Sequence, residues 1–206
     1  MSVGYDQVAD WIRRFAQEIA EHKGELTKLD QAIGDGDHGT NMDRGMRKAM
    51  ERLDGLEGDD IGAALKAVGM ALVSSVGGAG GPLYGTFFMQ MGQAAAGRSE
   101  LDAEGWAAAV KAGVDGVVTR GKAELGDKTM VDALRPAAEA LEGTTDVAEA
   151  VKRAAAAAEE GMRATTPLVA RKGRASYLGE RSAGHQDPGA TSSFLMMKAA
   201  ADALSD

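Results

Sequence analysis

Three aspartates in one short segment have the composition of a metal site. Asp30, Asp35 and Asp37 lie within eight residues and are separated by glycines. Carboxylates this close repel one another unless a cation lies between them, and hard oxygen ligands of this kind bind Mg²⁺ or Ca²⁺. A calcium loop of the EF-hand type needs a glutamate at its twelfth position, where this chain has Asn41 or Met46, depending on the first aspartate. The segment therefore predicts a magnesium site, and the alternative is a solvated acidic turn.

A helix start follows directly after these aspartates. Gly39, Thr40 and Asn41 open a predicted helix, so that backbone N–H groups and the positive end of the helix dipole face whatever the metal holds. An anion beside bound magnesium, most simply a phosphate, is the ligand that this combination favours.

Two further glycine-rich loops precede predicted helices. In residues 74–83 the backbone is almost bare, which lets it approach a ligand closely. The same loop, with Pro82 near the helix start, is equally typical of an ordinary helix cap. Residues 121–129 imitate a phosphate-binding P-loop, but Asp127 interrupts the motif and a helical pattern precedes it. This second loop is predicted to cap a helix or to form the adenine side of a site.

Residues 171–189 form a long loop that is basic in an otherwise acidic protein. Its cations are suited to binding phosphate or an acidic partner, and the alternative is that they pair with the protein's own acidic surface. A hydrolase triad of Ser182, His185 and Asp187 is disfavoured, because residues so near in sequence do not easily line up as a relay.

Helices are the elements that must position these loops. Aromatic residues make up only 4 % of the chain, and apolar residues recur at helical spacing. The stretches with this pattern are 8–19, 42–53, 61–72, 81–95, 106–117, 129–141, 146–165 and 189–204. No segment shows the sustained alternation of a strand. The predicted fold is therefore all-α, a single domain over residues 1–206 with about eight helices.

The composition excludes several classes of protein. A formal net charge of -8 argues against binding to nucleic acid, which depends on Lys and Arg neutralising phosphates. The absence of cysteine excludes disulfides, thiolate nucleophiles and cysteine-bound zinc. Residues 1–19 carry charges among their apolar positions, which fits neither a signal peptide nor a membrane span. No membrane contact is expected, and the expected compartment is the cytoplasm.

The four loops together resemble one family, dihydroxyacetone kinase subunit L, over nearly the whole chain. The matching stretches are DQAIGDGDHG at 30–39, SSVGGAGGPL at 74–83, GKAELGDKTM at 121–130 and GERSAGHQDPGATS at 179–192. They resemble the family in order and in spacing. Relatives often have a serine where this chain has Gly80, so the resemblance implies backbone contact with phosphate there and no hydroxyl contact.

The resemblance implies a barrel of eight antiparallel helices with ADP or ATP bound at one end. It implies that Asp30, Asp35 and Asp37 hold two Mg²⁺ ions. It also implies a set of residues around the nucleotide, namely His38, Gly39, Thr40, Asn41, Ala79, Gly80, Gly121, Met130, Arg174, Asp187, Pro188 and Gly189. Within the basic loop, Arg174 is expected to matter more than Lys172, because a buried guanidinium makes oriented paired hydrogen bonds to phosphate.

For function, the resemblance implies a phosphotransferase subunit that keeps its nucleotide as a coenzyme. A phosphocarrier subunit of the phosphoenolpyruvate-dependent phosphotransferase system rephosphorylates bound ADP, and the resulting ATP phosphorylates dihydroxyacetone held on a separate kinase subunit. Such transfer needs positioning and charge neutralisation, and no nucleophile on this chain. Two alternatives stay open: a subunit of an ATP-exchanging kinase for another short ketose, such as a tetrose, and a non-catalytic nucleotide-sensing interaction protein. A homodimer is compatible with the sequence.

Overall fold

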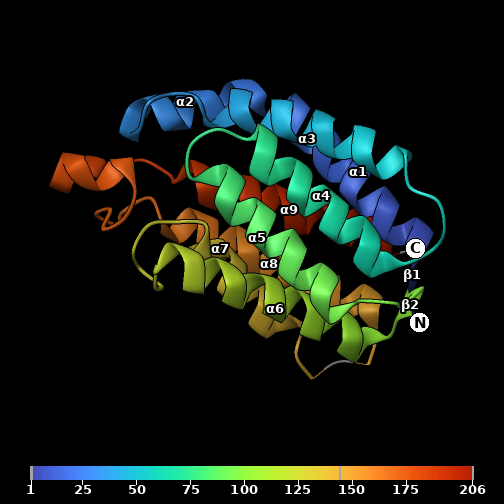
Figure 1. The fold of residues 1–206 in the computed structure, drawn as a ribbon. Coiled ribbons are helices and arrows are strands. Elements are labelled where there is room, and N and C mark those ends of the chain that lie inside the picture. Colours follow the sequence, from blue (N-terminus) through green and yellow to red (C-terminus); the bar gives the residue numbers. More distant parts are fainter. Residues whose placement is uncertain (1, 144, 206) are drawn as a thin grey trace.

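The computed structural model of the protein describes residues 2–143 and 145–205, whose regular secondary structure is almost entirely helical (Figure 1). The helices are α1 (Tyr5–Glu21), α2 (Lys23–Ile33), α3 (His38–Asp54), α4 (Ile61–Ser75), α5 (Gly80–Ala94), α6 (Ala103–Gly121), α7 (Val131–Leu141), α8 (Val147–Ala164), the 3₁₀ helix η1 (Arg174–Ser182) and α9 (Pro188–Leu204). The described residues form only one small sheet, in which β1 (Val3–Gly4) pairs antiparallel with β2 (Glu100–Leu101). The all-α prediction is confirmed.

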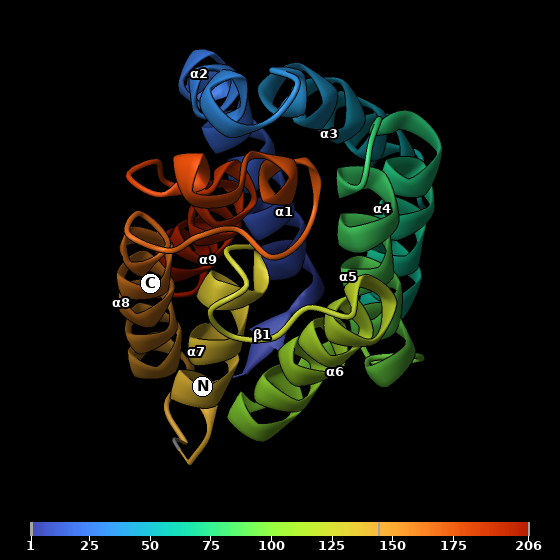
Figure 2. The ribbon, with the colours of Figure 1, turned by 90° about the vertical axis from the view of Figure 1, so that its left-hand side faces the viewer.

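Eight of these helices close into a barrel, as Figure 2 shows in a view along its length. The neighbours around the ring are, in order, α1, α3, α4, α5, α6, α7, α8 and α9, and α9 packs against α1 to close it. They are the eight helices that the apolar periodicity predicts. Each buries its apolar stripe inside the ring, so the barrel holds one continuous hydrophobic core. At its centre, Trp11 packs edge-on against Trp106 at 5.2 Å between ring centroids and donates its indole N–H to the Met196 carbonyl at 3.0 Å.

Two helical elements were not predicted, and both lie outside the ring. Helix α2 buries only Leu26, Asp30 and Ile33, so its inward face carries a carboxylate where a periodic pattern needs an apolar side chain. The 3₁₀ helix η1 lies within residues 171–189, for which the sequence predicts a loop. A small second cluster, in which Ile33 packs with Ala170 and Ala175, attaches η1 to the end of α2.

Glycines allow α4 and α5 to approach each other very closely. A Cβ atom added to Gly69 would lie 2.8 Å from the Gly85 carbonyl oxygen and 2.9 Å from the Met89 nitrogen. Gly62 meets Gly92 in the same way, with 2.6 Å to the carbonyl oxygen. Because backbone atoms lie this close, a movement of nearby side chains such as that of Met89 would not relieve the clash, so this seam requires glycine.

We expect Gly69→Ala to destabilise the protein, because the new methyl group must push two helices apart. Overpacking of this kind costs about 1–3 kcal/mol in free energy of unfolding. Gly24→Ala is the matched control, since Gly24 lies in α2 with nothing within 4 Å of an added Cβ. There, alanine should stabilise by up to about 1 kcal/mol through helix propensity. Urea unfolding of both variants checks this, and equal stability of the two would contradict the close-packed seam.

The two ends of the barrel are different. Helices α3, α5, α7 and α9 begin at one end, beside η1, whereas β1, β2 and both termini lie at the other (Figure 1). None of the described helices combines the length and the apolar character needed to cross a membrane.

Candidate nucleotide and metal site

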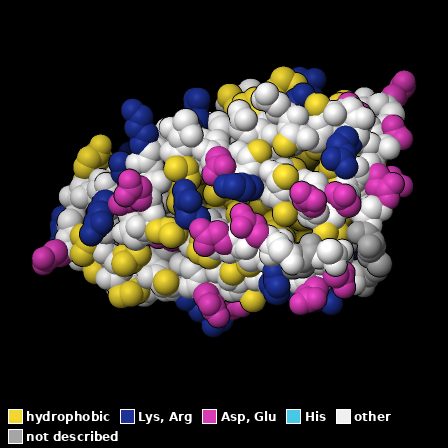
Figure 3. Space-filling view, turned by 90° about the horizontal axis from the view of Figure 1, so that it is seen from below, with side chains coloured by type: hydrophobic (Ala, Val, Ile, Leu, Met, Phe, Trp, Pro, Cys, Tyr) yellow, Lys and Arg dark blue, Asp and Glu magenta, His cyan; other side chains and the backbone are white. Residues whose placement is uncertain are grey.

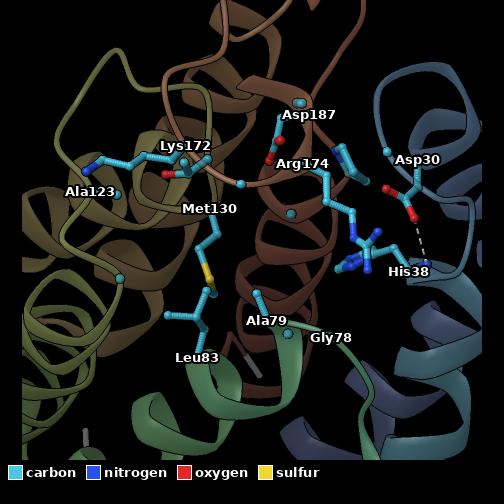
Figure 4. Close-up of a pocket in the computed structure, with 18 of the residues that line it drawn as sticks. Asp30, His38, Gly78, Ala79, Leu83, Ala123, Met130, Lys172, Arg174 and Asp187 are labelled. Carbon is cyan, nitrogen blue, oxygen red and sulfur yellow. Dashed lines mark hydrogen bonds between the residues drawn. The ribbon is translucent and has the colours of Figure 1, made fainter. Parts of the chain in front are cut away.

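A cavity of about 490 Å³ opens at the end of the barrel where four helices begin (Figure 4). The predicted site residues that line it are Asp30, Asp35, Asp37, His38, Ala79, Gly80, Gly121, Met130, Arg174, Asp187, Pro188 and Gly189. The remaining three, Gly39, Thr40 and Asn41, do not line it. Five segments that are distant in sequence therefore meet around one cavity.

The carboxylates of the three predicted metal-binding aspartates lie close together. One carboxylate oxygen from each of Asp30, Asp35 and Asp37 lies within 4.8 Å of the others. Asp30 is only 9 % exposed, and one of its oxygens accepts the backbone N–H groups of Asp37 at 2.8 Å and His38 at 3.0 Å. The other two aspartates are more exposed and face solvent. A fixed carboxylate with two freer ones suits Mg²⁺, which takes a few carboxylates and completes its octahedron with phosphates or water.

Glycines shape the loop that carries these carboxylates. A Cβ atom at Gly34 would lie 2.1 Å from an oxygen of Asp30, so any larger residue would displace this carboxylate. Gly36 has a φ of +74°, a left-handed conformation that side-chain-bearing residues rarely adopt. The spacing of glycine and aspartate in the segment is therefore needed for its conformation.

The three predicted residues outside the lining have different surroundings. Gly39 packs α3 on α2, since an added Cβ would lie 2.2 Å from the Lys23 carbonyl oxygen. Asn41 accepts a hydrogen bond from Arg44 at 2.7 Å and lies against Gly77 in the glycine-rich loop. Thr40 is exposed.

Four helix N-termini point at the cavity. The first residues of α3, α5, α7 and α9 all line it, namely His38, Gly80, Val131 and Pro188. The N-cap residues Asp37, Ala79 and Met130 make no side-chain hydrogen bond to the helices they precede. Partial positive charge from several helix dipoles is therefore concentrated next to the carboxylates. This arrangement is suited to an anion that is held partly by helix ends and partly through cations.

A buried polar network that was not predicted lies behind His38. The His38 ring nitrogen Nε2 is 2.8 Å from the Ser192 hydroxyl, which is also 2.7 Å from the Tyr84 hydroxyl. Tyr84 is a further 3.0 Å from the Ser193 hydroxyl. Burial lowers the pKa of His38, although Asp30 and Asp37 oppose the shift, and burial raises the pKa of Tyr84 to about 12. The network fixes the orientation of the imidazole at the cavity wall.

The structure corrects the premise that Arg174 is buried. Its side chain is 67 % exposed and forms an ion pair with Asp35 at 3.0 Å. Lys172, which was expected to matter less, also lines the cavity. The basic loop thus meets the aspartate cluster directly, and Figure 4 shows Arg174 reaching across toward Asp30 and His38.

Asp187 caps α9 at the inner wall of the cavity. Its carboxylate accepts the Ala190 N–H at 2.7 Å, as an N-cap side chain does. Burial raises the pKa of Asp187 to about 7, although the hydrogen bond from Ala190 and the charge of Lys128 favour the ionised form.

This raised pKa predicts a pH-dependent contribution to stability. Between the unfolded value of 3.8 and the folded value of about 7, the native state keeps a proton that the unfolded state has lost. The contribution of Asp187 to stability therefore falls as pH rises through this window, by up to about 1.4 kcal/mol per pH unit. Asp187→Asn keeps an N-cap of similar quality and removes the titration.

The measurement is the free energy of urea unfolding of the parent and of Asp187→Asn between pH 4.5 and pH 8. The stability of the variant relative to the parent should increase with pH across this range. A constant difference between the two proteins would show that Asp187 titrates at an ordinary value.

Comparison with known proteins identifies the family. The DAK2 domain model matches residues 32–202, and the chain belongs to this family. The chain is 48 % identical over 202 residues to the PEP-dependent dihydroxyacetone kinase, ADP-binding subunit DhaL, of Escherichia coli K12, covering 96 % of each protein. It is 36 % identical over 197 residues to L-erythrulose 1-kinase of Mycolicibacterium smegmatis, covering 94 % of this chain and 34 % of that protein.

A solved structure agrees with this assignment. The dihydroxyacetone kinase from C. freundii, in complex with AMP-PNP and Mg²⁺, superimposes with a TM-score of 0.72 at 26 % sequence identity. The match covers 95 % of this chain and 33 % of the kinase chain. The fold is therefore shared with a domain of a kinase that was crystallised with a nucleotide and magnesium.

Proposed function

We propose that this chain is the ADP-binding subunit of a phosphoenolpyruvate-dependent dihydroxyacetone kinase, with residues 1–206 forming one nucleotide-binding domain. The observation that carries the proposal is the convergence of three carboxylates beside helix N-termini, in a chain that is 48 % identical along its length to such a subunit. The composition of the site fits ADP or ATP bound through Mg²⁺.

The cavity has two chemically different halves, and each suits one part of a nucleotide. Met130 and Leu83 point toward one another on the apolar side, which suits an adenine ring, and Ala123 lines the same cavity (Figure 4). On the other side lie Asp30 and Arg174 with the N-terminus of α3. We assign the phosphates to this half, between the start of α3 and the Ala79–Gly80 start of α5.

Two magnesium ions on Asp30, Asp35 and Asp37 would supply the charge that neutralises the phosphate oxygens. The residues of this chain perform positioning. Asp30 is held by two backbone N–H groups, and the helix ends orient the phosphates by their own N–H groups. Arg174 offers a guanidinium to Asp35 or to phosphate at the cavity mouth. Phosphoryl transfer needs little more than this from the protein.

The acceptor and the donor belong to other chains in this proposal. Dihydroxyacetone is held by a partner kinase subunit, and a phosphocarrier subunit returns a phosphoryl group to the ADP. We place the whole cycle in the cytoplasm, where phosphoenolpyruvate is produced. A second candidate, a subunit of a kinase for a tetrose, is favoured by the similarity to L-erythrulose 1-kinase.

The test is the mass of the nucleotide released by denaturing protein that was purified without added nucleotide and then dialysed. A retained coenzyme should appear as ADP at close to one molecule per chain, whereas an exchanging subunit should release little. Adding the dihydroxyacetone-binding subunit and comparing dihydroxyacetone with erythrulose as acceptor separates the two kinases. Failure to bind Mg·ADP at all would overturn both.

A further inference from the structure

Lys128 is a fully buried lysine that the proposed reaction does not use. It lies in the loop between α6 and α7, and the residue is 1 % exposed. Its ammonium Nζ lies 2.7 Å from the carbonyl oxygen of Thr165, 3.1 Å from that of Leu168 and 3.3 Å from that of Thr166. It also donates to the carbonyl of His185.

These partners are unusual for a lysine. An ammonium group is rarely buried without an ion-pair partner, yet among the described residues Lys128 forms no ion pair within 4.0 Å, and the charges of Asp187 and Asp132 act on it from farther away. Four neutral backbone oxygens surround a group that has three N–H donors, so the donors are shared among the acceptors. Potassium sites in proteins are built from backbone carbonyl oxygens in the same way.

We infer that these four carbonyls form a monovalent-cation site of the potassium type that the ammonium of Lys128 occupies. The cation in this site is therefore part of the chain itself, and it fixes the position of the loop between α6 and α7. One consequence is that the protein needs no free K⁺ at this position.

The site joins three segments that build the cavity wall. Lys128, Thr129 and Met130 all line the cavity, and the carbonyls that the ammonium binds lead into the 172–175 and 187–189 stretches of the lining. Its backbone has a φ of +64°, which a residue with a side chain adopts only when other contacts favour it. Lys128 is therefore a positioning residue for the cavity. That role in nucleotide binding rests on the proposed function, whereas the cation site itself does not.

The test uses Lys128→Gly and Lys128→Ala, of which the glycine variant also suits the left-handed backbone. Lys122→Gly is the matched control, because Lys122 is an exposed lysine in the same loop with a φ of +50°. Each nucleotide-free protein is digested with trypsin in equal concentrations of KCl, NH4Cl, NaCl or LiCl. The masses of the fragments show how fast trypsin cuts between the Leu168 and His185 carbonyls. The sites there are Arg171, Lys172, Arg174 and Arg181.

The parent and Lys122→Gly should be cut slowly and at the same rate in all four salts. The Lys128 variants should be cut at least tenfold faster in LiCl, and KCl or NH4Cl should restore most of the protection, because these ions fill the vacated carbonyl site. The off-rate of Mg·ADP from the Lys128 variants should likewise be faster in LiCl than in KCl or NH4Cl.

Equal cleavage of the Lys128 variants in all salts would overturn the cation site, and so would a requirement of the parent for KCl. If the variants are unfolded in LiCl by circular dichroism, refolding in KCl or NH4Cl supports the site and failure to refold in any salt contradicts it. Loss of Mg·ADP binding by the parent would count against the proposed function alone, because the cleavage assay needs no nucleotide.

Discussion

Alanine at Asp30 is expected to abolish Mg·ADP binding, and alanine at Asp35 or Asp37 should weaken it severely. The remaining carboxylates cannot hold two magnesium ions against the charge of the phosphates. Asp30 has the largest expected effect because its carboxylate also accepts hydrogen bonds from the backbone N–H groups of Asp37 and His38, which its loss would leave without an acceptor. Removing one partner from a buried charged cluster costs about 3–5 kcal/mol, which is a loss of affinity of roughly 100-fold or more.

Isothermal titration calorimetry of nucleotide-free protein with Mg·ADP measures this. Asp54→Ala is the control, because Asp54 lies at the far end of α3 in an exposed ion pair with Arg13 and should leave affinity unchanged. A triple variant of the three cluster aspartates that still binds Mg·ADP like the parent would show that the metal site is misplaced.

Mg·ADP is expected to raise the melting temperature of nucleotide-free protein by several degrees. A ligand that binds only the native state contributes about 2.7 kcal/mol of stability at a concentration of one hundred times its Kd. For a chain of this length, each kcal/mol corresponds to roughly 2–4 °C, so a rise of about 5–10 °C follows.

The contribution of magnesium separates this effect from unspecific binding. ADP with EDTA should give a much smaller shift, since the phosphates would face three uncompensated carboxylates. Differential scanning fluorimetry with Mg²⁺ alone, ADP alone and both together provides the comparison. An unchanged melting temperature in Mg·ADP would contradict the whole assignment of the site.

The barrel helices were predictable because each buries a regular apolar stripe. Trp11, Phe15 and Ile19 recur at helical spacing in α1, and the other seven barrel helices follow the same rule. Helix α2 escapes this rule because its buried face includes the carboxylate of Asp30, which serves the site. The 3₁₀ helix η1 escapes it because its position depends on contacts of Ala175 with residues distant in sequence.

The site was predictable where its chemistry is local, and not where it depends on burial. Asp30, Asp35 and Asp37 lie within eight residues of one another, so the sequence alone predicts a cation site there. Lys122 and Lys128, by contrast, stand six residues apart in one loop and look alike in sequence. The tertiary packing places the backbone carbonyls of Thr165 and His185 against the ammonium of Lys128, which is buried, whereas Lys122 is exposed to solvent. The exposure of Arg174 likewise depends on how η1 packs against α2, which the local sequence does not determine.

The position of the strands and termini at the end of the barrel remote from the cavity bears on how the protein can be handled. A biotin, fluorophore or affinity peptide attached at either end would project away from the nucleotide. Protein anchored to a sensor chip through such an attachment would present its cavity, with the basic loop around the mouth, to the flowing solution. Subunit docking and nucleotide release could therefore be followed on the same immobilised molecules.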